Sequence, residues 1–403
     1  MSKSFGLFFL LLFLFIPKME ASEIELSDEA EIIVLILDPT QTELYSAFGH
    51  SAFRVSDPAN RIDMVFNYGI FDFDQPNFYL NFTKGKLYYK LGTGNYESYK
   101  RYYFRADRSW REHLLNIGRE DKQVIFDFLI NNAKPENANY YYNYCYDNCA
   151  TRMRDVVDVV LKDRISYDYS YANDSLSFRG LMDKYLGYQP WGDLGIDICL
   201  GSQIDEIANG SDYQYMPLYL EEALLTATLK TDSTMVPVVA SSATMNVSAE
   251  QPAEGDFRPI HLFVIVFFVV GLIIHRGLKY SVSYRFIDVV LFGITGLLGC
   301  FLLFLWFGTD HLSKYNYNLI WAMPLNLVGL FYLLKKSKPT WLRKYFIGLG
   351  TLQMLLIIFR ELLPQEIHFG LIPLVLALAI RSFYLAFELK NNTIHTEASH
   401  LDS

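Results

Sequence analysis

Cys149, His50 and Asn67 are the residues of this sequence whose types and surroundings can support nucleophilic chemistry. Asp147 and Asn148 stand just before Cys149, where side-chain oxygens cap free backbone N–H groups. After Cys149 the apolar residues have the spacing of one buried helix face: Met153, Val156, Val157, Val160 and Leu161. Cys149 is therefore predicted in the first turn of a helix, where the peptide dipole favours a thiolate. The alternative interpretation is a buried structural cysteine.

His50 begins the alternating segment HSAFRV, and after the turn residues SDPAN the segment IDMVFNYG alternates again. This pattern predicts an antiparallel hairpin. If its turn centres near Pro58 and Ala59, Asn67 lies directly opposite His50. An amide beside an imidazole holds one tautomer and leaves the other nitrogen free to accept a proton. Asp63 shares a strand face with Asn67 and is the reserve candidate for this role, while the alternative makes His50 an ordinary strand residue.

The chain order is histidine, amide and cysteine, whereas papain-like enzymes have the cysteine first. The predicted site is thus a circular permutation of the papain-like arrangement. Residues 22–230, which contain it, are predicted to form a domain of α+β class outside the membrane, called the external domain below. Three further residues are candidates for substrate binding: Arg152, Tyr68 and Asp63. Arg152 could bind a phosphate, but we favour a structural role in which it pairs with Asp155 at i, i+3. The segment from Ser109 to Ile130 is predicted as a helix, with Gly118 as a possible division.

The composition divides the chain into two domains. The 403 residues carry a net charge of −9 and are 51% hydrophobic, which is too apolar for an ordinary soluble protein of this length. Residues 22–230 mix charged and aromatic positions, residues 259–389 are apolar runs, and residues 231–258 are rich in Ser, Thr, Ala and Pro, as a flexible linker would be. Residues 390–403 form a predicted cytoplasmic tail. The acidic balance argues against nucleic acid as a partner.

A signal peptide is predicted at residues 1–21. Lys3 precedes the apolar run Phe5 to Ile16, and Ala21 offers a small residue for cleavage. Further apolar runs, each near the ~20 residues that cross a bilayer, predict membrane spans at Pro259 to His275, Phe286 to Gly308, Asn318 to Leu334, Tyr345 to Leu362 and Phe369 to Leu389.

The loops between these spans predict their orientation. Cationic residues gather in the first and third loops: Arg276, Lys279, Arg285, Lys335, Lys336, Lys338, Arg343 and Lys344. The alternate loops carry Asp310, His311, Glu361 and Glu366. Because cationic loops stay cytoplasmic, the external domain is predicted in the periplasm of a multi-pass inner-membrane protein whose C-terminus is cytoplasmic.

Four segments together resemble one family: FGHSAFRV, DMVFNYGIFDF, PENANYYYNYCYDNCATRMRD and NYNLIWAMPLNLV. They are similar to the Lnb-type lipoprotein N-acyltransferases of the Bacteroidetes, in which a permuted papain-like (NlpC/P60-like) domain precedes a five-helix membrane domain. The resemblance covers nearly the whole mature chain and implies an acyl-transfer pair at Cys149 and His50. It also implies a phospholipid acyl donor and, as acceptor, the α-amino group of a diacylated lipoprotein cysteine. The third member, Asn67, comes from our strand geometry and not from the family.

Other functions remain open. A membrane-tethered cysteine peptidase or amidase acting on peptidoglycan is one alternative, and a non-catalytic binding module is another. No cofactor is predicted, and no cluster has zinc-ligand spacing. A disulfide between Cys145 and Cys199 would spare Cys149, whereas a bond between Cys145 and Cys149 would block it.

Overall fold

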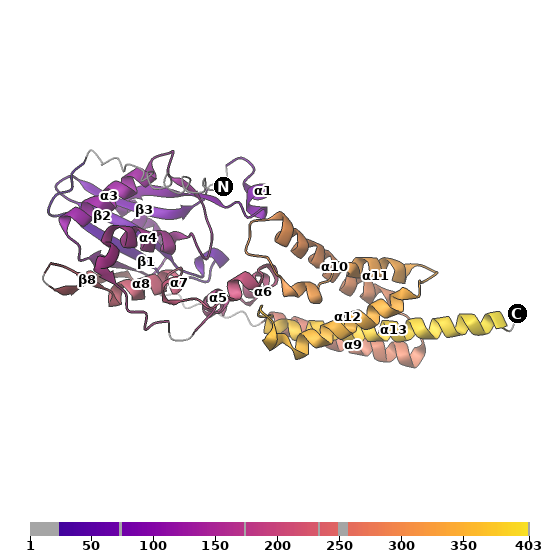
Figure 1. The fold of residues 1–403 in the computed structure, drawn as a ribbon. Helices are drawn as coiled ribbons and strands as arrows, with labels where there is room; N and C mark the ends of the chain where they lie inside the picture. The colour runs from indigo at the N-terminus through magenta and orange to yellow at the C-terminus, as the bar shows by residue number, and fades with distance from the viewer. Residues whose placement is uncertain (1–23, 72–74, 173–174, 233, 249–256, 402–403) are drawn as a thin grey trace, which may run out of the picture.

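The computed structural model describes residues 24–71, 75–172, 175–232, 234–248 and 257–401, with side chains up to residue 391. The external domain is built on an antiparallel sheet of seven strands in the order β10-β5-β1-β2-β3-β4-β6 (Figure 1). Its strands are β1 (Glu31–Leu37), β2 (His50–Asp57), β3 (Ile62–Ile70), β4 (Tyr88–Asn95), β5 (Trp110–Leu115), β6 (Asn139–Tyr141) and β10 (Val239–Asn246). A second sheet joins β7 (Ile165–Ser166), β8 (Thr228–Lys230) and β9 (Met235–Pro237). The predicted signal peptide lies outside the described residues.

Helices cover both faces of the large sheet. On one face α3 (Arg119–Ala133), α4 (Cys149–Leu161) and α8 (Pro217–Thr226) bury the main apolar core. On the other face α2 (Tyr96–Arg105) packs a smaller cluster. Because side chains alternate along a strand, β1 serves both cores, with Ile32 and Val34 on the first face and Ile33 and Leu35 on the second. The α+β class of this domain is confirmed.

Two predictions for this domain are wrong. Residues 110–115 form strand β5, which lies between β10 and β1 in the sheet, and the helix predicted from Ser109 begins only at Arg119. Residues 235–246, predicted within a flexible linker, form β9 and β10 instead. In both cases a neighbouring strand decides the conformation, because β5 pairs with β1 on one side and with β10 on the other.

The second domain has five helices long and apolar enough to cross a membrane, as predicted. They are α9 (Pro259–Tyr280), α10 (Arg285–Gly308), α11 (Leu325–Leu334) with a preceding 3-10 turn, α12 (Trp341–Ile358) and α13 (Ile372–Leu401). Helix α13 packs against α12 and α9, and α10 packs against α11. Arg381 of α13 and Asp288 of α10 are fully buried and pair at 2.7 Å, which joins these two groups by an ion pair inside the apolar domain.

The two domains are docked through α6 (Pro190–Cys199). The C-terminal carbonyls of this helix, which lack partners within it, accept hydrogen bonds from the loop after α10. The amide of Asn316 donates to Ile198 O at 2.8 Å, and that of Asn318 donates to Asp197 O at 2.9 Å. The backbone N–H of Gly201 donates to Leu312 O at 2.9 Å.

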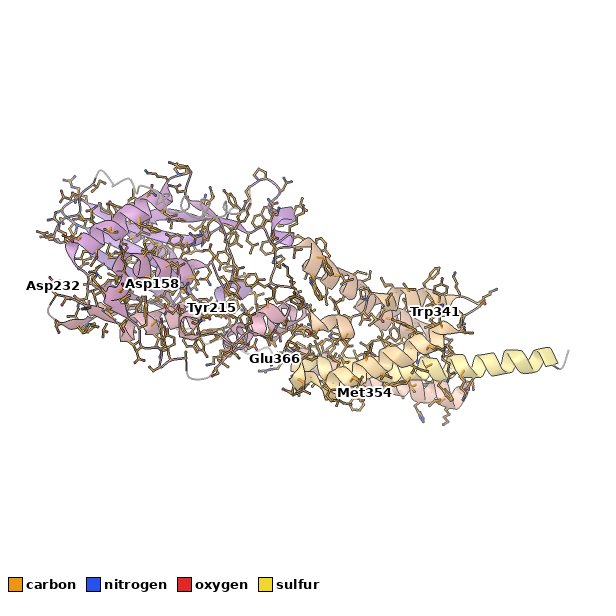
Figure 2. All side chains as sticks on the ribbon, viewed as in Figure 1. Asp158, Tyr215, Asp232, Trp341, Met354 and Glu366 are labelled. Carbon is orange, nitrogen blue, oxygen red and sulfur yellow. The ribbon has the colours of Figure 1, made fainter. Side chains whose placement is uncertain are left out.

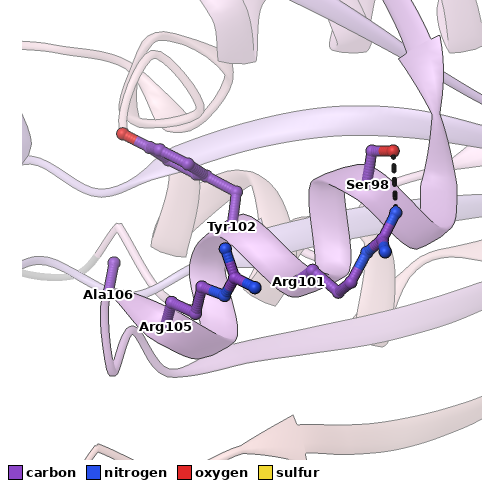
Figure 3. A pocket seen from close by; sticks show the side chains of 5 residues that line it. All are labelled: Ser98, Arg101, Tyr102, Arg105 and Ala106. Carbon is purple, nitrogen blue, oxygen red and sulfur yellow. Dashed lines mark hydrogen bonds between the residues drawn. The ribbon is translucent and has the colours of Figure 1, made fainter.

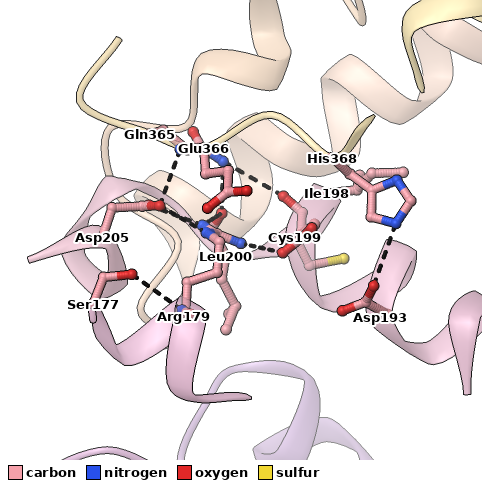
Figure 4. A network of polar contacts seen from close by, with 12 residues as sticks. Ser177, Arg179, Asp193, Ile198, Cys199, Leu200, Asp205, Gln365, Glu366 and His368 are labelled. Atoms are coloured by element: carbon pink, nitrogen blue, oxygen red, sulfur yellow. Dashed lines mark hydrogen bonds and ion pairs between the residues drawn. The ribbon is translucent and has the colours of Figure 1, made fainter. Parts of the chain in front are cut away.

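A polar network reinforces this junction (Figure 4). Arg179 of α5 (Phe178–Leu186) is fully buried and pairs with Asp197 at 2.6 Å and Asp205 at 2.8 Å. Asp205 in turn accepts the backbone N–H of Glu366, which is labelled at the junction in Figure 2, at 3.0 Å. His368 lies 3.3 Å from Asp193. These contacts fix the position of the external domain on the membrane helices.

Candidate functional site

Cys149 is the first residue of α4, and its neighbour Asn148 caps that helix. The Asn148 side-chain oxygen accepts the N–H groups of Ala150 at 2.9 Å and Thr151 at 3.0 Å. The Asn148 amide nitrogen donates to the carbonyl of Tyr215 at 2.8 Å, so the cap itself is held in place. Within the described residues the backbone N–H of Cys149 has no hydrogen-bond partner. This N–H points out of the helix N-terminus, where the peptide dipole favours negative charge.

His50 lies at the start of β2, and its Nε2 is 2.6 Å from Asn67 Oδ1 on β3. An amide oxygen only accepts, so Nε2 carries the proton in this contact. Nδ1 is then the nitrogen available to Cys149, to which His50 is hydrogen-bonded. The predicted register was wrong by two residues: Phe53 pairs with Phe66, which places Asn67 diagonally from His50 and not directly opposite. The contact still forms, because diagonal neighbours on one strand face remain within reach of polar side chains.

Cys149 and His50 each shift the pKa of the other toward its charged form. Burial raises the pKa of the Cys149 thiol, but the facing His50 imidazolium and the backbone N–H and hydroxyl of Ser51 outweigh it, so that this pKa lies below its ordinary value. Burial also lowers the pKa of His50, and the Cys149 sulfur and the Asn67 amide reverse this and hold the pKa above 6.5. The buried Ser51 hydroxyl has no hydrogen-bond partner within the described chain. The pair can therefore carry a thiolate beside a protonated imidazole, the state required of a cysteine nucleophile.

A cavity of about 1190 Å³ opens from this pair, and we call it the Cys149 cavity. Its walls are predominantly apolar and aromatic, with Tyr89, Tyr142 and Met216 from the external domain. Phe301 and Leu305 of α10 line its other end, so that the cavity spans the junction between the two domains. Such a space can hold a long apolar group with its reactive end at Cys149.

The predicted substrate-binding residues do not line the Cys149 cavity. Arg152 binds the Asp147 carboxylate through two nitrogens and stacks 4.2 Å from the ring centre of Tyr140. The expected pairing of Arg152 with Asp155 is wrong, because Arg154 binds Asp155 at 2.8 Å. A structural role for Arg152 thus agrees with its contacts.

Tyr68 and Asp63 lie elsewhere on β3. Tyr68 is buried in the main core, with its ring centre 6.2 Å from that of Tyr140. Asp63 pairs with Arg54 at 2.7 Å, and so it does not orient His50. In contrast, His311 in the loop after α10 does line the cavity, where its Nε2 lies 3.1 Å from Phe82 O.

Two further residues, Ser51 and Arg108, lie close to the pair and were not predicted from the sequence. Ser51 directly follows His50, and its N–H faces the sulfur because Cys149 lies at the end of β2. Arg108 lines the cavity from the turn between α2 and β5. No local pattern marks Arg108, because its position depends on the strand β5 that the sequence did not reveal.

All four cysteines are free. Neither of the two disulfides that the sequence left open forms, so Cys149 is not blocked. Cys145 is buried, and burial raises the pKa of its thiol. Cys199 lines the same cavity as Cys149.

One group of side chains has metal-ligand spacing in the described chain. Ligand atoms of Asp193, Asp197 and His368 lie within 4.8 Å of one another. Asp197 already pairs with Arg179, and His368 pairs with Asp193. The pair of Asp193 and His368 joins the two domains, and we assign the group to docking and not to a metal.

An α+β domain with a buried Cys–His pair, docked on five apolar helices, defines a polytopic membrane protein whose site lies where the two parts meet. Two family models match the chain: the Lnb N-terminal periplasmic domain at residues 26–181 and the Lnb transmembrane domain at residues 250–392. The chain therefore belongs to the Lnb family, as a membrane protein with a periplasmic N-terminal domain. No curated protein and no solved structure matches it.

Proposed function

We propose that this protein is a lipoprotein N-acyltransferase of the inner membrane. It moves an acyl chain from a membrane phospholipid, through a thioester on Cys149, to the α-amino group of a diacylated lipoprotein. The observation that carries this proposal is the Cys149 cavity, which joins a thiolate–imidazolium pair to apolar residues of a membrane helix. Family membership supports the same function.

In the first half-reaction the Cys149 thiolate attacks an ester carbonyl of the phospholipid. The carbonyl oxygen becomes an oxyanion, for which the unpartnered N–H of Cys149 is the available donor at the helix start. When this intermediate collapses, the bond to the glycerol oxygen breaks and that oxygen takes the proton from His50. A lysophospholipid leaves, and the acyl chain stays on sulfur.

In the second half-reaction the lipoprotein amine attacks the thioester. An α-amino group has a pKa near 7.7–8.0 in model peptides, so a useful fraction is neutral. His50, now neutral, removes the amine proton as the amide bond forms, and the thiolate of Cys149 leaves. Asn67 keeps Nδ1 directed at the reacting atoms throughout, because its oxygen holds Nε2–H at 2.6 Å.

Water competes with the amine for the thioester, and the site limits its access. Cys149 is 7% exposed, and Tyr142 and Met216 line the space around it. A peptidase would need this space open to water and to a polar chain. A tether for such a peptidase would also need one span, whereas five spans and a shared cavity favour a substrate that arrives from the bilayer. The C-terminus is then cytoplasmic.

The test uses Cys149→Ser and His50→Ala variants, expressed with a reporter lipoprotein in a strain that depends on this gene. Mass spectrometry of the reporter should show an added N-linked acyl chain with the wild type and none with either variant. Incubation of the purified wild type with phospholipid should give an acyl mass shift on Cys149. If the wild type adds no acyl chain to the reporter, the proposal fails.

A further inference from the structure

Arg108 is held at the Cys149 cavity by its backbone. It follows Asp107, whose φ of 45° is the left-handed conformation that aspartate tolerates better than most residues. The backbone N–H of Arg108 donates to Tyr103 O at 3.0 Å, and its carbonyl accepts the amide of Asn246 at 3.0 Å. Two elements, α2 and β10, therefore fix the point from which the guanidinium extends into the cavity.

The positive charge of Arg108 is not neutralised by the protein. Its Nε donates to the backbone carbonyl of Asp38 at 3.2 Å, but the Asp38 carboxylate pairs with Arg111 at 2.7 Å. Its Nη2 is buried and has no hydrogen-bond partner among the described residues, and no described carboxylate forms an ion pair with it. An unpaired buried guanidinium nitrogen is unfavourable. The ring centre of Tyr103 lies 5.8 Å from Cζ of Arg108 and adds no negative charge. An anion that enters the cavity would supply the opposite charge.

The lining of the cavity selects for such an anion. Among its described lining residues Arg108 is the single lysine or arginine, and none is aspartate or glutamate. Asp38 is the residue after Leu37, which pairs with His50 across β1 and β2, so the anchor of Arg108 lies next to the Cys149–His50 pair. The same cavity thus offers a nucleophile, an adjacent cation and an apolar region at Phe301.

We infer that Arg108 binds the phosphodiester of the glycerophospholipid donor and so places its acyl ester against Cys149. This inference rests on the proposed acyl transfer. In a glycerophospholipid the phosphate and the acyl esters share one glycerol unit, so a phosphate site must lie close to the nucleophile. A guanidinium matches a phosphate through directed hydrogen bonds. Nη1 of Arg108 is not among the buried unpaired atoms and has no hydrogen bond to the described residues, so it is the nitrogen available to donate from the cavity wall. The acyl chain then extends along the apolar walls toward α10.

Other arginines near the nucleophile lack these properties. Arg152, the candidate from the sequence, has its charge taken by Asp147 and lies outside the cavity. Arg105 lies one turn before Arg108 and is exposed on α2, where it lines a separate surface hollow with Ser98 and Tyr102 (Figure 3). Arg105 is therefore a matched control, since it has the same side chain and lies at the end of the helix that precedes Arg108, but it does not line the Cys149 cavity.

The experiment compares two acyl donors with the full-length protein in mixed micelles. The donors are a phosphatidylethanolamine and a diacylglycerol with the same acyl chains, and the readout is the rate of acylation of Cys149 by mass spectrometry. Arg108→Met should lower the preference for phospholipid over diacylglycerol by about 10- to 100-fold, the range expected for a charge-assisted hydrogen bond. Arg108→Lys, which keeps a point charge, should lose less. Arg105→Met should keep the wild-type preference.

Each outcome decides one question. If Arg108→Met slows both donors equally, Arg108 holds the fold or the pair and the inference is overturned. Phosphatidylglycerol serves as a second phospholipid donor. A loss of rate with only one of the two phospholipids would also overturn the inference, because the phosphate is common to both. If wild-type Cys149 accepts no acyl chain from either donor, the proposed function itself fails. If Arg108→Met does not fold, as judged by thermal unfolding, the preference for phospholipid over diacylglycerol is measured for Arg108→Lys. An unchanged preference in that variant would then overturn the inference.

Discussion

Replacement of Asn67 by alanine should slow acylation of Cys149 without unfolding the protein. The Asn67 oxygen accepts Nε2–H of His50 at 2.6 Å, and this contact fixes which ring nitrogen faces the sulfur. A hydrogen bond to a charged group contributes about 1.5–3 kcal/mol. If that energy is lost where the imidazole acts, the acylation rate falls by about 10- to 150-fold. Asn67→Asp keeps an acceptor oxygen and should retain more of the rate than alanine does.

The assay measures the single-turnover rate of acyl transfer to Cys149 by rapid quench and mass spectrometry. Asp63→Asn is the matched control on the same strand, because Asp63 pairs with Arg54 and lies outside the Cys149 cavity. Loss of the ion pair between Asp63 and Arg54 should lower the free energy of unfolding by only about 0.2–1 kcal/mol, as for a solvent-accessible pair. An Asn67→Ala rate within about threefold of the wild type would refute the view that this amide orients His50.

Two further predictions concern titration. Alkylation of Cys149 by iodoacetamide, followed by mass spectrometry across pH, should have its midpoint below the ordinary thiol pKa. In the His50→Ala variant burial still raises the pKa of Cys149 and no imidazolium lowers it, so the midpoint should rise. Equal midpoints in the wild type and the variant would contradict the electrostatic coupling of Cys149 with His50. At the domain junction, burial and the neighbouring Asp197 raise the pKa of Asp183 to about 8. The folded state then keeps a proton that the unfolded state releases near 3.8, so the free energy of unfolding should fall as pH rises from about 4 to about 8. Asp183→Asn should weaken this dependence in thermal unfolding scans in detergent, and an unchanged pH dependence would exclude Asp183 as its source.

The sequence correctly predicted those parts of the fold that depend on residues close together along the chain. The five spans follow from continuous apolar runs, which must be helical in a bilayer whatever surrounds them. The start of α4 follows from a capping residue and an apolar face within a few residues of Cys149. Both signals depend on neighbours along the chain, and both were predicted at nearly the observed positions.

The parts that the sequence missed depend on partners far along the chain. Strand β5 carries Glu112 and His113, which are buried because Arg54 and Glu221 bind them at 3.1 and 2.6 Å. Because the partners of these polar residues lie far along the chain, the local sequence of β5 does not show the apolar alternation that is typical of a strand. Strand β10 forms because β5 offers it an edge, although its own sequence is that of a linker.

The geometry of the site was predicted only in part. The hairpin of His50 and Asn67 was predicted, but its register was not, because the turn between β2 and β3 includes Arg61 at a φ of 57° and moves the pairing by two residues. Arg108 had no signal at all, since only the observed sheet brings the turn after α2 to the cavity.

Domain docking is what turns a cysteine–histidine pair into a site suited to lipid. The pair alone, at the end of a sheet, is compatible with many acceptors. Phe301 and Leu305 of α10 add to the apolar lining of the Cys149 cavity, and the loop after α10 is bound to α6. A change that loosens α6 from this loop should therefore expose the thioester to water while leaving Cys149 and His50 in contact. In the acyl transfer that we propose, the choice between amide formation and hydrolysis is then decided at the junction of the domains, at a distance from the nucleophile itself.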